Sequence, residues 1–238
     1  MTAMMEREHA TAADTDTAAA GFVVHVDVLR SLLAGALVAA SKDDTTPALC
    51  AVQLEWDATE LHANATDRYR LAVGRYAFDR DVLGQHGAPT AGSVLLARAD
   101  VERIVKGMPK TTARDRAGWT VRVSLPDSVI HAGASSSVLV EWMEWNRPAG
   151  MLVLAAMDEA FPKWRTLIPT DDALSEGSMP LVVNPAYLAD VAKLSPHKNA
   201  PVRIRTSATS RPAVLDYPST ADDASVVQWL YLLMPVRI

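Results

Sequence analysis

The 238-residue sequence is poor in the features that secreted and membrane proteins carry. It holds a single cysteine, Cys50, so no disulfide can form within one chain, and the apolar stretch around it favours a small buried residue in a reducing compartment. No run of about 18 apolar residues is present, which excludes an ordinary transmembrane helix. The first twenty residues lack the basic start and apolar block of a secretion signal. We therefore expect a cytoplasmic protein without membrane contact.

Positive charge is also scarce. Lys and Arg number 23 against 28 Asp and Glu, which gives a net charge of −5. The molecule as a whole is therefore not a basic nucleic-acid binder, and any contact with DNA requires a local basic face.

Motifs for covalent chemistry are missing as well. The sequence has no phosphate-cradling glycine loop, no CxxC pair and no HxxxH helix. Ser41, His62 and Asp67, or the adjacent carboxylates Asp158 and Glu159, could suggest catalysis. However, Asp67 is typical of a turn that bonds its own backbone, and adjacent residues on regular structure point apart. We expect no catalytic residue, no metal site and no cofactor, and therefore no enzyme.

The sequence does contain one pattern three times: a short β-rich run, a helix with an apolar stripe, and then alternating segments typical of antiparallel strands. Asp27 is predicted to cap the first helix, and the second is expected from about Asp100. The third helix is predicted to have Asn184 as its cap and Pro185 at its first helical position.

The strands expected after the second helix are "WTVRVSL" (119–125), "SVIHAGA" (128–134) and "SSVLVEWMEW" (136–145). The stretch that starts at "MLVLA" (151–155) contains two prolines, and we interpret it as a crossover.

One unit of this kind cannot cover its own sheet, whereas two units related by a pseudo-dyad can bury their helices and sheet faces together. The fold class is therefore expected to be α+β, with antiparallel sheets and helices on one face. The predicted division is a disordered tail (1–20), a two-unit domain (21–158), a crossover linker (159–177) and a single-unit half-domain (178–238).

Four stretches carry a resemblance to a known family: "ATDRYRLA" (65–72), "FPKWRTLIP" (161–169), "VNPAYLADVAKL" (183–194) and "YLLMPVRI" (231–238). Together, and in this order, they resemble the bacterial DNA polymerase III beta subunit, the DNA sliding clamp. The resemblance covers the second and third of that family's three domains and implies the DNA-clamp fold.

The chain departs from the family in its number of units. A family member has six units and closes a ring as a dimer, whereas this sequence shows about three. It looks like a shortened relative of the kind expected from a phage or mobile element. The resemblance implies a homo-oligomer, and a tetramer would supply the family's twelve units.

The resemblance also implies a groove between the second and third domains, where polymerases and clamp loaders dock a short apolar peptide. Carried over by position, its predicted lining is Thr66, Arg68, Tyr69, Arg70, Leu71, Pro162, Arg165, Thr166, Leu167, Leu232, Met234, Pro235, Val236, Arg237 and Ile238. Two residues depart from the family pattern: Arg68 stands at a turn position usually held by glycine, and Thr166 where a second arginine is common.

Duplex DNA is the other partner that the resemblance implies, through contacts to phosphates and not to base edges. The predicted contacts are Arg30, Lys42, Arg98, Arg103, Lys106, Lys110, Arg114, Lys193 and Lys198. Cations also occur on helices that simply face solvent, so this set depends on the resemblance.

The function predicted from these features is that of a DNA sliding-clamp-like processivity factor. Two alternatives stay open. The first is a non-encircling adaptor or decoy that binds clamp-binding peptide motifs, and the second is a small regulatory DNA-binding protein without a ring.

Overall fold

The computed structural model describes residues 20–112, 114–125, 137–175, 182–197, 200–207, 211–218 and 227–236. The first unit comprises β1 (Ala20–His25), α1 (Val26–Ala36), β2 (Ala51–Trp56), β3 (Glu60–Thr66) and β4 (Arg70–Ala77). The second comprises β5 (Gly92–Ala97), α3 (Arg98–Gly107), β6 (Trp119–Leu125), β7 (Ser137–Glu144) and β8 (Arg147–Ala155). The third comprises α5 (Pro185–Asp190), β9 (Arg203–Arg205), β10 (Ala213–Asp216) and β11 (Gln228–Leu233).

The first two units exchange their leading strands. A four-stranded sheet has the order β1-β6-β7-β8, so β1 of the first unit pairs with β6 of the second. In return, β5 of the second unit pairs with β2 of the first. All of these pairs are antiparallel, which confirms the predicted α+β class with antiparallel sheets.

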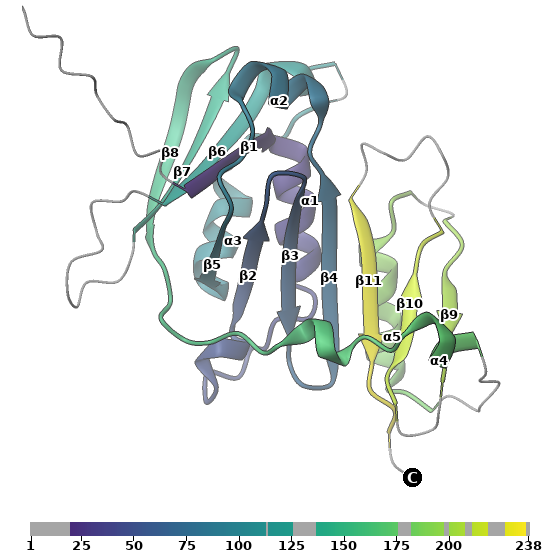
Figure 1. Cartoon of the computed structure of the whole chain (residues 1–238). Helices are drawn as coiled ribbons and strands as arrows, with labels where there is room; N and C mark the ends of the chain where they lie inside the picture. Colours follow the sequence, from purple (N-terminus) through teal and green to yellow (C-terminus); the bar gives the residue numbers. More distant parts are fainter. Residues whose placement is uncertain are drawn as a thin grey trace, which may run out of the picture.

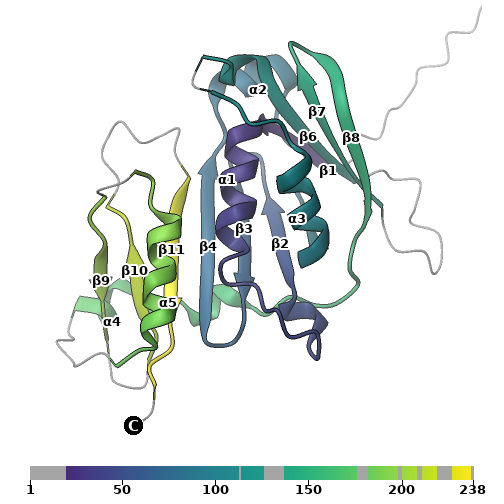
Figure 2. The same cartoon turned by 180° about the vertical axis from the view of Figure 1, so that it is seen from behind.

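A seven-stranded sheet joins the third unit to the first, in the order β5-β2-β3-β4-β11-β10-β9. The joint is the antiparallel pair β4–β11, which runs from Gln228 opposite Arg75 to Leu233 opposite Arg70. Helices α1, α3 and α5 all lie on one face of this sheet (Figure 2). The core between helices and sheet contains Leu29, Leu32, Val101 and Ile104, all essentially inaccessible to solvent.

The crossover between the second and third units runs over the opposite face of the seven-stranded sheet, near one end of its strands (Figure 1). It contains a 3-10 turn (Trp164–Leu167) and the short helix α4 (Asp171–Ser175). Trp164 and Leu174 pack there with Leu71 and Leu232, so the crossover covers the β4–β11 joint on the face opposite the helices.

The predicted helix starts are partly wrong. Helix α1 begins at Val26 with His25 at its N-cap position, and Asp27 lies in the first turn, where its carboxylate pairs with Arg116 at 3.0 Å. Helix α3 begins at Arg98, two residues before the predicted Asp100. The third prediction is confirmed, since the Asn184 side chain accepts a hydrogen bond from the Ala186 amide at 2.9 Å.

The sequence prediction also missed elements. Strand β8 occupies the stretch that was interpreted as the start of the crossover, and Pro148 lies near its beginning. The missing N–H of a proline is harmless on an edge strand such as β8, so the proline does not end the sheet. Helix α2 (Arg80–His86) was not predicted either; the side chain of Asp79 caps it.

Several predictions concern residues that the structure does not describe. The expected strand 128–134 lies outside the described residues, and so does the expected tail except for Ala20, which begins β1. Cys50 is half-buried and not fully buried as expected; its Sγ lies 2.8 Å from the carbonyl oxygen of Asp43. The division into domains stays a prediction, although the order of the elements agrees with it.

Candidate functional site

The turn between β3 and β4 is held by its own side chains. Thr66 Oγ1 donates to the carbonyl oxygen of Arg70 at 2.8 Å. Asp67 Oδ1 accepts from the amides of Tyr69 at 3.1 Å and Arg70 at 3.0 Å. Arg68 has φ 77, a left-handed conformation that favours glycine and strains other residues. This conformation explains why glycine suits the position.

The C-terminal segment lies directly beside this turn. In the β4–β11 pair, Leu232 is opposite Leu71. After β11 ends, the amide of Met234 donates to the carbonyl oxygen of Tyr69 at 2.9 Å. Two stretches that are far apart in the sequence are therefore fixed side by side by backbone hydrogen bonds.

A cavity of about 280 Å³ opens where the turn, the crossover and the C-terminal segment meet. Its lining is Leu49, Thr66, Arg68, Arg70, Leu71, Pro162, Leu167, Pro212, Leu232 and Met234. Most of these side chains are apolar. Leu167 and Met234 are 46% and 41% exposed, so part of their surface is open to a visiting group.

Most of the residues predicted for the groove line this cavity, but not all do. Arg165 forms an ion pair with Glu55 at 2.9 Å, and Thr166 Oγ1 donates to the carbonyl oxygen of Lys163 at 2.7 Å. The remaining predicted residues outside the lining are Tyr69, Pro235 and Val236. Arg237 and Ile238 lie outside the described residues.

Leu49 and Pro212 line the cavity and were not predicted. Neither belongs to the four resembling stretches. Pro212 could have been found from strand register, because Ala213 pairs with Leu233 and the antiparallel ladder then brings Pro212 toward Met234.

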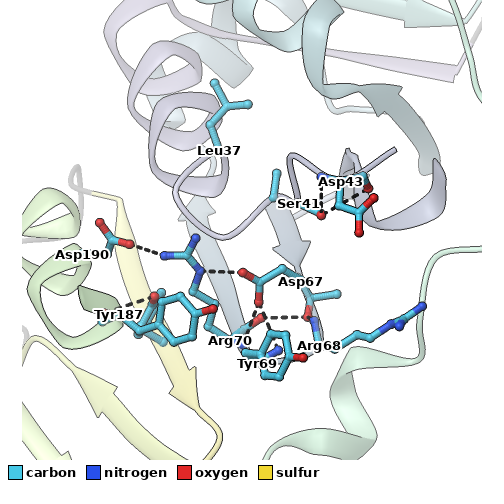
Figure 3. A network of polar contacts seen from close by, with 12 residues as sticks. Leu37, Ser41, Asp43, Asp67, Arg68, Tyr69, Arg70, Tyr187 and Asp190 are labelled. Carbon is cyan, nitrogen blue, oxygen red and sulfur yellow. Dashed lines mark hydrogen bonds and ion pairs between the residues drawn. The ribbon is translucent and has the colours of Figure 1, made fainter. Parts of the chain in front are cut away.

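A second, more polar cavity of about 580 Å³ lies next to the first and shares Leu49, Arg68 and Arg70 with it. Figure 3 shows Arg70 between two carboxylates from different units. Its Nε donates to Asp67 Oδ2 at 2.9 Å, and another guanidinium nitrogen pairs with Asp190 of α5. The guanidinium carbon also lies 4.6 Å from the centre of the Tyr187 ring.

Electrostatics at this contact favours ionised Asp190. Burial alone would raise the pKa of Asp190, but hydrogen bonding to Lys193 and the charge of Arg70 outweigh it and hold the pKa below its usual value. Burial raises the pKa of nearby Tyr231 to about 12, so this phenol stays neutral at physiological pH. The Arg70–Asp190 pair therefore connects the first and third units beside the apolar cavity.

The residues considered for catalysis are engaged in structural contacts. Asp67 holds the turn, and the His62 ring lies 5.8 Å from that of Trp164. Ser41 Oγ accepts from the Asp43 amide at 3.0 Å. Within the described ranges, no group of three or more His, Cys, Asp and Glu residues is arranged to hold a metal ion. None of the helices in those ranges is long and apolar enough to span a bilayer.

The predicted DNA contacts separate into two kinds. Arg30 donates to the carbonyl oxygens of Val105 at 2.6 Å and Pro109 at 2.5 Å. Arg98 donates to the carbonyl oxygen of Ala40 at 2.8 Å and pairs with Glu102 at 3.1 Å. Both guanidinium groups thus have partners inside the protein, and a DNA contact by these two arginines stays a prediction.

The other predicted cations are exposed: Lys42, Arg103, Lys106, Lys110, Arg114 and Lys193. Arg103 and Lys106 project from α3, and Lys193 follows α5, on the helix-bearing side of the seven-stranded sheet. Lys198 lies outside the described residues.

Solved structures show which class of fold this is. The DNA polymerase III beta subunit of Thermotoga maritima superposes with a TM-score of 0.65 at 17% identity, covering 98% of this chain and 70% of that chain. A Pseudomonas aeruginosa DnaN sliding clamp bound to griselimycin gives 0.66 at 15% identity, covering 92% of this chain and 65% of that chain. The protein therefore has the DNA-clamp fold.

Sequence comparison shows the relationship directly. The beta sliding clamp of Streptomyces coelicolor is 25% identical over 205 residues, which cover 85% of this chain and 47% of the clamp. The beta sliding clamp homolog GriR of Streptomyces muensis is 31% identical over 100 residues, which cover 40% of this chain and 24% of the homolog. No protein-family model matches. The chain is thus similar in sequence and in fold to bacterial DNA polymerase III beta subunits, the sliding clamps, and it spans less than half the length of the curated relatives it matches.

Proposed function

We propose that this protein is a sliding-clamp-like processivity factor, acting in the cytoplasm, which tethers a DNA polymerase and other partners to duplex DNA through a peptide groove. The observation that carries the proposal is the apolar cavity at the β4–β11 joint. Three of the four stretches that resemble sliding clamps meet at this one cavity. The relationship to proteins named sliding clamps supports a binding role without enzymatic activity.

The cavity suits a short apolar peptide. Ligand pockets range from roughly 300 to 1,000 Å³, and a cavity of about 280 Å³ lies just below that range. One or two large side chains such as Leu or Phe fit this size better than a cofactor does. Arg68 and Arg70 at the border offer donors to a carbonyl or carboxylate of the bound peptide. Met234 provides a flexible wall that can adapt to different partners.

The DNA part of the proposal depends on the exposed cations of the helix-bearing side. Such cations bind phosphates without reading sequence, and salt weakens the binding. Reversing two of these charges in Arg103→Glu/Lys106→Glu is expected to weaken DNA binding about tenfold or more at low salt. Lys163→Glu, on the crossover across the sheet, is the matched control and should leave binding nearly unchanged. Equal losses in both variants would contradict the assignment of the helix-bearing side.

Encirclement is tested by retention on nicked circular DNA in the presence of a bacterial clamp loader and ATP. A clamp stays on the circle in gel filtration and is lost when the circle is linearised. Equal retention on circular and linear DNA would indicate simple DNA binding. Failure to be retained on circles, with peptide binding intact, would support the non-encircling adaptor instead.

A further inference from the structure

The third unit has an uncovered apolar face between α5 and β9. A shallow cavity of about 610 Å³ lies there, and its apolar lining includes Leu188, Val191, Val202, Ile204 and Leu215. Leu188 and Val202 are each 39% exposed, and Ile204 is 49% exposed. This face is separate from the groove at the β4–β11 joint, since the two cavities have no lining residue in common.

The other two units show what normally covers this face. The fourth residue after the N-cap is Leu29 in α1, Val101 in α3 and Leu188 in α5. Leu29 and Val101 are 0% exposed because the first and second units pack against each other. The same position in the third unit is 39% exposed.

The first strand after each helix shows the same difference in the exposure of its inward-facing residues. The inward residues of β2, such as Val52 and Leu54, and those of β6, such as Val121 and Val123, are all 0% exposed. The corresponding residues of the third unit are Ile204 on β9, which is 49% exposed, and Val202 directly before β9, which is 39% exposed. The third unit therefore has the inward apolar residues of a paired unit, and no second unit covers them among the residues that the structure describes.

The strand pairing also distinguishes the third unit from the first two. In the paired units, the strand that precedes one helix lies along the first strand after the other helix, as β1 lies along β6 and β5 along β2. Among the described residues β9 pairs only with β10, so its outer edge is open. Val182, which precedes α5, is 40% exposed and belongs to no strand, although its carbonyl oxygen accepts a hydrogen bond from the Val236 amide at 2.8 Å.

We propose that this face binds the same face of a second copy of the chain, so that two third units complete one two-unit domain. Val182 and Val183, directly before α5 of each copy, would lie beside β9 of the other copy, which is a reciprocal contact around a dyad. Arg203 and Arg205 on β9 already pair with Asp216 at 2.8 and 3.0 Å, so the contact does not bring bare like charges together. In the first two units, a face of this kind is covered by another unit of the same kind, so a second copy of the chain offers a partner of matching chemistry and shape.

Light scattering coupled to size exclusion tests this on the full chain. The wild-type protein is expected at an even multiple of 25.7 kDa at about 50 µM. A charge placed in the apolar contact by Ile204→Glu, or independently by Leu188→Glu, should halve that mass and raise the dissociation constant about 100-fold or more. Both positions are exposed in the single chain, so the variants should fold, which circular dichroism checks.

Leu167→Glu, on an equally exposed apolar residue outside this face, is the control and should keep the wild-type mass. A monomeric wild type, or a mass that both face variants leave unchanged, overturns the proposal. The proposal does not depend on the groove: Ile204→Glu should still bind a groove peptide, so the two assignments can fail separately.

Discussion

The groove assignment leads to a prediction whose size can be worked out from two opposed side chains. Leu167 projects from the crossover and Met234 from the C-terminal segment, and they are 46% and 41% exposed in the free protein. Complete burial of a Leu or Met side chain contributes roughly 1.5–3 kcal/mol. A ligand that covers the exposed part of each gains about 1 kcal/mol per side chain, so truncating both in Leu167→Ala/Met234→Ala costs about 2 kcal/mol. This is about a 30-fold rise in the dissociation constant.

Fluorescence polarisation with a labelled Gln-Leu-x-Leu-Phe peptide measures this change. The control is Met151→Ala/Val153→Ala on β8, where both side chains are 59% exposed and lie in the other sheet. It removes similar apolar surface away from the groove and should leave the affinity within about twofold. The groove assignment is refuted if the double variant in the cavity binds as well as wild type, or if the control loses as much affinity.

Three further predictions concern the turn and its contact with α5. Arg70→Met should destabilise the chain by about 2–3 kcal/mol in urea unfolding, because it leaves two partly buried carboxylates without their shared partner. The folded-state pKa of Asp190 is lowered, so its ionisation stabilises the fold above about pH 4. The stability difference between wild type and Asp190→Asn should therefore shrink as the pH falls below that value, and a difference that grows on acidification would contradict the ion-pair assignment. Arg68 has a positive φ, so Arg68→Gly should be at least about 1 kcal/mol more stable than Arg68→Val, and equal melting temperatures would argue against the left-handed conformation.

The repeated units were predictable because each is encoded locally. The apolar stripe of α1 and the Asn184–Pro185 start of α5 are local signals, and both are present in the structure. The strand β8 was missed because the stretch from Met151 was assigned to the crossover together with Pro162 and Pro169, which follow the strand, whereas its pairing as an edge strand depends on the whole topology.

The candidate site shows the same limit. The resembling stretches predicted that Thr66, Leu167 and Met234 lie at one site, and all three line the cavity. Leu49 and Pro212 belong to none of these stretches, and Pro212 can be placed only once the strand register is known. The sequence shows the charge of Arg30 but not the carbonyl oxygens that surround it. Local patterns therefore predict which elements form, while the partners of a long side chain are decided by the assembled fold.

The pairing of β4 with β11 has a mechanical consequence. Since one wall of the cavity belongs to each strand, peeling the third unit away would erase the cavity even if both strands kept their shape. A ligand that contacts both walls binds only while β4 and β11 are paired. Its binding therefore raises the free energy needed to detach the third unit. A bound partner would thus stabilise the β4–β11 pairing, and β11 would separate from β4 most easily in a molecule with no partner bound.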